Sequence, residues 1–294
     1  MNTIHYLKNY RLSKRIWRRM TDLLSTRPSG LPQPRRYPGI NWIGVRTLYL
    51  REVRRFWKVG AQTVAAPVVT TLLYMLVFVV ALQNARPPLH GTPFALFVAP
   101  GLIMMAMLQN SFANSSFSLL VGKIQGTIVD YLMPPLSTGE LLAALCAGAV
   151  TRAFCVGATV WLAMALWPGV SVAPHHVWAI LWFGFLGSLF LALLGVMTSI
   201  WAEKFDHAAA VTNFVVAPLA LLSGTFYSVD KLAPTFQAIS HANPFFYIIS
   251  GFRYGFLGVA DSPIVLGSAV ILGLNMLLGL ACYALLRSGW KTRS

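Results

Sequence analysis

The residue pair Gly122-Lys123 is the part of this sequence nearest to a nucleotide-binding motif. ATP-driven machines hold phosphates with a GxxxxGK[ST] loop at the start of a helix, where the lysine and backbone N–H groups meet the phosphate oxygens. Here the earlier glycine is missing and Ile124 replaces the hydroxyl residue. We therefore expect the chain itself to bind no cofactor, neither ATP nor Mg²⁺.

The histidines and cysteines do not have the spacing of a metal site or a catalytic set. His175 and His176 are adjacent, the other four histidines are scattered, and the three cysteines lie in apolar stretches without a CxxC pair. No nucleophile, histidine and acid can be assigned together to one membrane face. A membrane-embedded enzyme that acts on lipids remains the alternative to a transport protein.

Ionisable residues inside apolar stretches are the other place to look for chemistry, because acids there typically serve as proton or sodium relays. The eight acids all fall in loops or near the ends of apolar stretches, whereas Arg152 lies well inside one. Coupling to an ion gradient is disfavoured, so the energy for transport must come from a second protein. Arg152 either snorkels to the cytoplasmic headgroups or pairs with a loop acid, or it lies at the inner mouth of a pathway.

The amino-acid composition of the chain is typical of a membrane protein. Hydrophobic residues make up 56% of the 294 and charged residues only 11%, against about 25% charged in soluble domains. A helix needs about 20 apolar residues to cross the hydrocarbon. The stretches that qualify are Ala61 to Leu82, Phe94 to Leu119, Leu141 to Trp167, Val177 to Ile200, Ala208 to Tyr227 and Pro263 to Leu286. The predicted fold is thus an all-α membrane protein with six transmembrane helices in region 61–286.

The basic residues predict the orientation. Residues 1–58 contain 14 of the 23 Lys and Arg, and the stretch Met1 to Met20 does not have the apolar region of a secretory signal. If both termini lie on one side, 19 basic residues face that side and three face the other, so the positive-inside rule makes both termini cytoplasmic. We interpret residues 1–40 as a flexible, proline-rich cytoplasmic head and residues 287–294 as a cytoplasmic tail. Binding of nucleic acid by the basic residues of 1–58 is disfavoured because this region directly precedes the first span, where basic residues hold a loop on the cytoplasmic side.

Residues 41–60 are predicted to form an amphipathic helix that lies at the membrane interface. Their apolar residues group on one side of a helical wheel, and the basic side faces membrane lipid headgroups. The basic residues are Arg51, Arg54, Arg55 and Lys58. Glu52 falls among the apolar residues, where it pairs with Arg55 or with another group.

The segment before the last span is predicted to form two short helices, re-entrant or lying on the outer surface. The stretch Pro244 to Leu257 is too short to cross the membrane and carries Arg253, while Asn243 and Pro244 are suited to start a helix. Its aromatic residues are interpreted as a belt at the membrane interface. The alternative is a role in guiding substrate, with these candidate pathway residues: Arg152, Asn243, Pro244, Tyr247, Arg253 and Tyr254.

Three stretches resemble the permease subunit of bacterial ABC-2-type transporters, in particular the short inner-membrane transport permeases. They are Ala99-Pro-Gly-Leu-Ile-Met-Met105, Gly224-Thr-Phe-Tyr-Ser228 and Asn243-Pro-Phe-Phe-Tyr-Ile-Ile-Ser-Gly-Phe-Arg-Tyr-Gly-Phe-Leu-Gly258. The resemblance covers about Thr47 to Leu286. The proline-rich head is longer than the family pattern.

The resemblance implies a homodimer in the bacterial inner membrane, powered by a separate ABC ATPase subunit that carries ATP and Mg²⁺. It implies an exporter whose substrate is drug-like, a lipid or a glycolipid, and it makes the amphipathic segment the family's connecting elbow helix. It also implies that residues Gly122 to Leu132 form a coupling helix that docks on the ATPase. The residues assigned to that contact are Lys123, Ile124, Gln125, Ile128, Val129 and Asp130, with the isoleucines and valine as anchors and the two charges at the rim.

Overall fold

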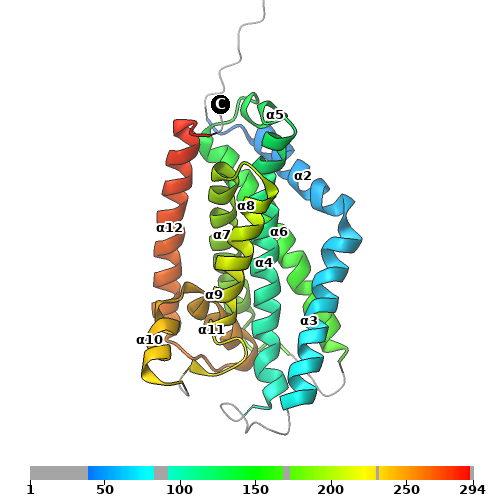
Figure 1. The fold of residues 1–294 in the computed structure, drawn as a ribbon, viewed down its shortest axis with the longest axis vertical. Coiled ribbons are helices and arrows are strands. Elements are labelled where there is room, and N and C mark those ends of the chain that lie inside the picture. Colours follow the sequence, from blue (N-terminus) through cyan, green and yellow to red (C-terminus); the bar gives the residue numbers. More distant parts are fainter. Residues whose placement is uncertain (1–38, 83–91, 168–172, 230–231, 292–294) are drawn as a thin grey trace, which may run out of the picture. The chain divides into compact units, whose positions relative to one another are not determined.

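The computed structural model describes residues 39–82, 92–167, 173–229 and 232–291. The chain divides into two units between Ile40 and Asn41. Most of the first unit, including nearly all of the predicted head, lies outside the described residues. The second unit, described below, is a helical bundle, and its described residues contain no β-strand (Figure 1).

Five helices of this unit are long and apolar enough to cross a membrane. They are α3 (Gly60–Leu82), α4 (Phe94–Ile124), α6 (Thr138–Ala165), α7 (Val177–Trp201) and α12 (Ile264–Ser288). The fifth predicted stretch differs from these because it forms a shorter apolar run, Phe205–Leu221. This run consists of α8 (Phe205–Val211), the π-helical turn η1 (Thr212–Val216) and α9 (Ala217–Leu221).

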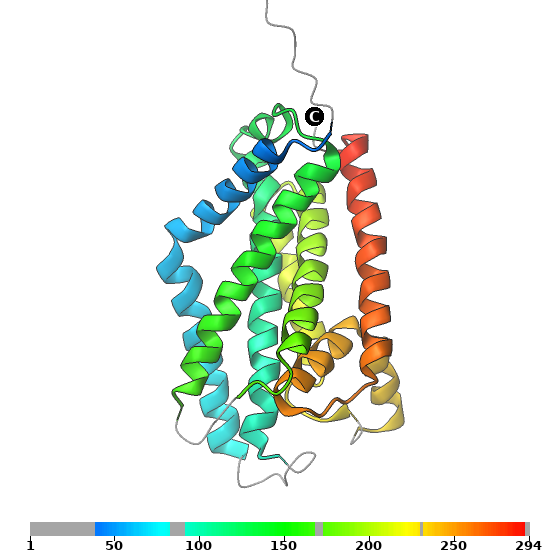
Figure 2. The ribbon, with the colours of Figure 1, turned by 180° about the vertical axis from the view of Figure 1, so that it is seen from behind.

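Helix α4 is the centre of the bundle. It is apolar around most of its circumference, as expected for a helix enclosed by others. In its apolar stretch of 18 residues, 89% is buried inside the protein, compared with 17% in the corresponding stretches of α3 and α12. It packs mainly against α7 and α6, with α11 and α3 on its remaining sides. The two exposed helices therefore lie on the outside of a core built from α4, α6 and α7 (Figure 2).

Helices α4 and α7 approach closely at Gly195. A Cβ atom at this position would lie 2.8 Å from the Phe112 carbonyl oxygen and 3.0 Å from the Ser116 backbone nitrogen. Both atoms belong to the backbone and cannot turn aside. Small residues at a helix contact let two backbones approach in this way, which stabilises membrane helix pairs by close packing.

We expect Gly195→Ala to lower the free energy of unfolding by about 1–3 kcal/mol, because the added methyl group overpacks this contact. Thermal unfolding of the purified chain in detergent measures the effect. Gly279→Ala is the matched control on α12, where an added Cβ meets nothing within 4 Å. Equal stability of both variants would contradict the close contact.

Hydrogen bonds at one end of the bundle join the start of α2 (Trp42–Lys58) to α6, and the ends of α4 and α12 to the end of α7. The Asn41 backbone N–H donates to Glu140, which also caps α6 through Ser137. Lys291, after α12, pairs with Glu203, after α7, at 2.6 Å. We call this the α5 end, because α5 (Val129–Leu132) also lies there (Figure 1).

The opposite end carries two short helices, α10 (Pro234–Ala242) and α11 (Pro244–Leu257), which we call the α11 end. The boundary between them lies at Asn243, whose side chain accepts a hydrogen bond from the Phe245 N–H at 3.0 Å, and Pro244 occupies the first turn of α11. The predicted pair of short helices and its start signal are confirmed.

The aromatic residues of α11 do not form an interfacial belt, so this interpretation is wrong. Its phenylalanines Phe245, Phe246, Phe252 and Phe256 are all buried, and only its two tyrosines are partly exposed. The cause is that α11 packs into the bundle against α7, α4 and α12 instead of lying on its surface.

Arg253 is likewise enclosed by protein. The prediction of orientation counted it among the three basic residues of the outer face, but it does not lie in an outer loop. The residue as a whole is 1% exposed. The guanidinium pairs with Asp261 and donates to the carbonyl oxygens of Phe97 at 3.3 Å and Gly224 at 2.8 Å. It also lies 3.8 Å above the centre of the Phe97 ring. Arg253 thus holds the start of α4, the turn after α9 and the loop after α11 together.

Candidate functional site at the α5 end

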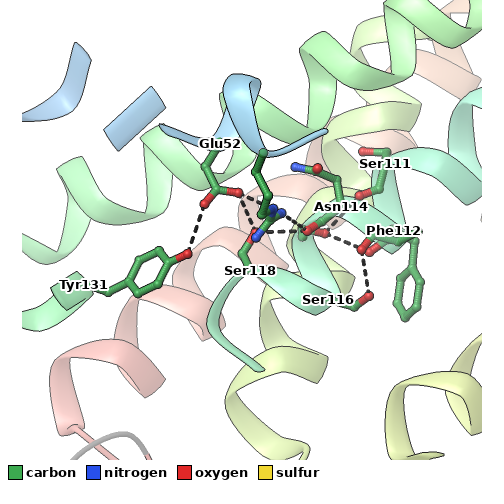
Figure 3. Close-up of polar contacts among 10 residues, drawn as sticks. Glu52, Ser111, Phe112, Asn114, Ser116, Ser118 and Tyr131 are labelled. Carbon is green, nitrogen blue, oxygen red and sulfur yellow. Dashed lines mark hydrogen bonds and ion pairs between the residues drawn. The ribbon is translucent and has the colours of Figure 1, made fainter. Parts of the chain in front are cut away.

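Glu52 of α2 is the centre of a buried polar network between α2, α4 and α5 (Figure 3). Its carboxylate is fully buried and pairs with Arg55 at 2.8 Å. It also accepts hydrogen bonds from Ser118 of α4 at 2.8 Å and from Tyr131 of α5 at 3.4 Å. The structure therefore contains both of the expected arrangements, the pair with Arg55 and a contact to other groups.

Tyr131 connects this network to the loop between α4 and α6. Its hydroxyl faces Glu52, while the guanidinium of Arg51 lies 4.1 Å from the centre of its ring. Burial, together with the neighbouring Glu52 carboxylate, raises the pKa of the Tyr131 phenol above its usual value, so the phenol stays a hydrogen-bond donor at neutral pH. The α4–α6 loop is thus attached to α2 through Tyr131, and also through Asn41 at the start of α2, whose side chain donates to the Pro135 carbonyl oxygen at 3.1 Å.

We expect Glu52→Gln to lower the free energy of unfolding by about 1–3 kcal/mol. Breaking a buried pair leaves the remaining charge poorly compensated, and partial exposure of Arg55, 29% of its side chain, reduces the cost. Thermal unfolding in detergent measures the change. Glu203→Gln is the control, because its pair with Lys291 is exposed and such pairs contribute about 0–1 kcal/mol. Equal losses in both variants would argue against the buried network.

The predicted coupling segment, Gly122 to Leu132, is not one helix. Helix α4 ends at Ile124, Gly126 follows with φ of 70°, and a single turn, α5, begins at Val129. A left-handed residue cannot continue a right-handed helix, and glycine adopts this conformation without the usual steric cost. The segment is therefore a helix end, a turn and a second short helix.

Three apolar side chains of this segment, and that of Met133 directly after it, are exposed at the α5 end, and we call these four the apolar edge. They are Ile124, Val129, Leu132 and Met133, with exposed fractions of 43%, 50%, 39% and 80%. The predicted anchor Ile128 is half-buried instead, because its backbone packs against Gly122. Among the predicted polar contacts, Gln125 and Asp130 are exposed.

Lys123 is not a free charge at the rim of this segment, which corrects the prediction. Its ammonium group donates to the carbonyl oxygens of Ile200 and, at 3.3 Å, of Ala202. These groups belong to the C-terminal end of α7, where a cation is favoured by the orphan carbonyls and the helix dipole. Lys123 therefore caps α7.

Of the residues predicted for the elbow helix, Arg54 and Lys58 are exposed on α2.

Arg152 lies in α6, where it donates a hydrogen bond to the side-chain oxygen of Asn110 in α4 at 3.1 Å. Both residues line a cavity of about 440 Å³ between α3, α4 and α6. A second, smaller cavity, of about 340 Å³, lies on the other side of Arg152 near the junction of α2 and α3. The side chain is half-buried among these helices.

The remaining candidate pathway residues lie at the α11 end and not with Arg152. Asn243 and Pro244 start α11, and Arg253 is buried in its hydrogen bonds. Tyr254 stacks on His176 at the start of α7, with 4.8 Å between ring centres. Tyr247 is partly buried beside Phe246, with 5.3 Å between the centres of the two rings. The structure therefore separates the predicted pathway set into two groups.

Sequence reasoning missed the polar residues of α4. Asn110, Asn114 and Ser118 are buried, as are the serines between them. Their spacing of four residues places them on one helix face, so a polar stripe in an apolar span was the available signal. Ser118 joins the Glu52 network and Asn110 holds Arg152.

Comparison with known proteins adds a family match. The family model described as "ABC-2 type transporter" matches residues 44–257. The inner membrane transport permease YadH of Escherichia coli K12 is 34% identical over 254 residues, which cover 86% of this chain and 98% of the relative. Nodulation protein J of Sinorhizobium fredii is 25% identical over 269 residues, covering 89% of this chain and 92% of the relative. The family-model match includes most of α2, the apolar edge and α11.

Proposed function

Since the chain belongs to the ABC-2 type transporter family, we propose that it is the membrane-spanning subunit of an ATP-driven exporter and that a separate ABC ATPase binds it. The coarser description rests on the family directly: the chain is a multi-pass transport permease of the inner membrane. The proposal adds the partner, the direction of transport and the assembly of two copies.

The observation that carries the proposal is the apolar edge at the α5 end. Exposed apolar side chains that are held in place by a folded loop are typical of a protein-binding surface. Here the loop is fixed by Tyr131 and the buried Glu52 network, so the edge is held ready for a partner. A force applied to the loop by a closing ATPase reaches α2 and α4 through these contacts.

The topology that fits this function has six crossings and a cytoplasmic α5 end. The described chain enters the bundle at Asn41 and leaves it at Lys291, both at the α5 end, and an odd number of crossings cannot return it there. The run Phe205–Leu221 therefore supplies the sixth crossing beside the five long helices. We propose that α2 lies as an elbow helix in the inner leaflet, and that α10 and α11 re-enter the outer leaflet.

The proposal is tested by co-expressing the full chain with an ABC ATPase encoded by a neighbouring gene and purifying the complex into lipid nanodiscs. Stable co-purification with ATP hydrolysis is the expected result. Two copies of the permease per complex, measured by mass photometry, are expected for a homodimer. A chain that is folded but binds no ABC ATPase would overturn the assignment.

A further inference from the structure

The cavity of about 440 Å³ between α3, α4 and α6 combines a cation with polar and apolar walls. Ligand sites in proteins typically have volumes of about 300–1,000 Å³ and a few well-placed polar groups. One face of α3 contributes Gln62, Thr63, Thr70 and Thr71, and α4 contributes Gln109 and Asn110. Arg152 enters this wall from α6.

Arg152 has hydrogen-bonding capacity that the protein does not use. One terminal nitrogen donates to Asn110, whereas the Nε atom is buried with no hydrogen-bond partner among the described residues. Arg55 is the second cation nearby, but its charge is compensated by Glu52 at 2.8 Å. The cavity wall is therefore positively charged. A guanidinium binds carboxylate and phosphate groups through several N–H donors in a fixed planar arrangement, so an anion in the cavity is the ligand that suits Arg152.

The cavity opens toward the outside of the bundle along α3. Tyr74, which lines it, is 41% exposed, and the neighbouring outward residues Val69, Leu73 and Val77 are exposed and apolar. In a membrane these residues face the lipid chains, because α3 is an apolar span of which little is buried. The inner wall adds apolar surface at Leu102 and Met105. A ligand with an anionic head and an apolar tail matches both parts.

We propose that this cavity binds the anionic headgroup, a phosphate or a carboxylate, of an amphiphile that enters from the membrane. Arg152 binds the anion, the amide and hydroxyl groups of α3 and α4 complete its hydrogen bonds, and the tail lies along α3. The proposed site names the substrate class of the exporter. It rests on the proposed function only for the statement that the ligand is transported.

Binding is tested on the full-length chain purified without an ATPase, so that failure here is distinct from failure of the proposed function. Native mass spectrometry compares dioleoyl phosphatidylglycerol with dioleoyl phosphatidylcholine, which share acyl chains and differ in net headgroup charge. We expect a preference of about tenfold or more for the anionic lipid, the gain from one hydrogen bond to a charged group. Arg152→Gln is expected to abolish it, and Arg287→Gln, the same charge change at an exposed position near the end of α12, to keep it.

A second pair of variants avoids any change of charge. Ala66→Trp fills the cavity from α3 and is expected to remove the preference with Arg152 intact. Ala65→Trp, at an exposed neighbouring position outside the cavity lining, is expected to keep it. A preference for phosphatidylglycerol that survives both Arg152→Gln and Ala66→Trp would overturn the proposed binding site.

Two further measurements distinguish the possible sources of the anion. Millimolar inorganic phosphate is expected to leave bound phosphatidylglycerol in place, and its displacement would assign the site to soluble anions and overturn the amphiphile. Phosphatidylglycerol is expected to stimulate ATP hydrolysis by the ATPase in complex with the unchanged chain but not in complex with the Arg152→Gln variant. Binding without stimulation would make the lipid a resident one and overturn the substrate class.

Discussion

Replacing Arg253 with methionine is expected to lower the free energy of unfolding by about 3–5 kcal/mol, the cost of removing one partner from a buried ion pair. The change deprives Asp261 of its guanidinium in a site where both side chains are only 2% exposed. It also removes the donors to Phe97 and Gly224. Because these groups belong to three separate segments, the whole α11 end loses its connection.

The measurement is thermal or denaturant-induced unfolding of the purified chain in detergent. Arg54→Met is the matched control, since Arg54 is exposed on α2 and its loss changes stability by about 0.5 kcal/mol or less. The double variant Arg253→Met with Asp261→Asn is expected to recover part of the loss, because the uncompensated carboxylate is gone. A single variant as stable as the control would show that Arg253 does not hold the α11 end together.

The second large effect is expected at the apolar edge, where Met133→Asp should weaken binding of the ATPase by about 30-fold or more. A well-packed apolar residue at the centre of an interface contributes about 2 kcal/mol or more, which corresponds to that factor. Met133 is the most exposed residue of the edge, at 80%. A carboxylate there must be desolvated when the partner covers it.

Binding is measured by biolayer interferometry between nanodisc-embedded permease and the purified ATPase. Leu166→Asp is the control, because Leu166 ends α6 at the other end of the bundle and is 86% exposed. Both variants are expected to unfold at the temperature of the unchanged chain. Undiminished affinity of Met133→Asp would contradict docking at the apolar edge.

The sequence predicted the elements that follow from local patterns. Long apolar runs gave the five spans, and Asn243-Pro244 marked the start of α11 because capping is a local property. The wheel of α2 likewise identified Glu52 as an acid on the buried side. These predictions needed only residues within a few turns of each other.

Apart from Arg55, which pairs with Glu52 within one helical turn, most partners of the charged residues were not predictable, because they are distant in sequence. Ser118 and Tyr131 lie 66 and 79 residues from Glu52, and Phe97 lies 156 residues from Arg253. The aromatic residues of α11 were wrongly assigned to the membrane interface because composition does not distinguish lipid from protein as their surroundings, since both are apolar. The turn at Gly126 escaped notice for another reason, as glycine is also tolerated within a helix at a small cost.

The contacts of Arg253 also bear on the order in which the chain is made. Phe97 and Gly224 are synthesised before Arg253, so both acceptors already exist when the arginine leaves the ribosome. Asp261 follows eight residues later, which takes about one second at typical rates of about 5–20 residues per second. The guanidinium is therefore without its counter-ion for a short time only. We expect a nascent chain truncated just before Asp261 to have an unstable α11 end, which cellular quality control would recognise.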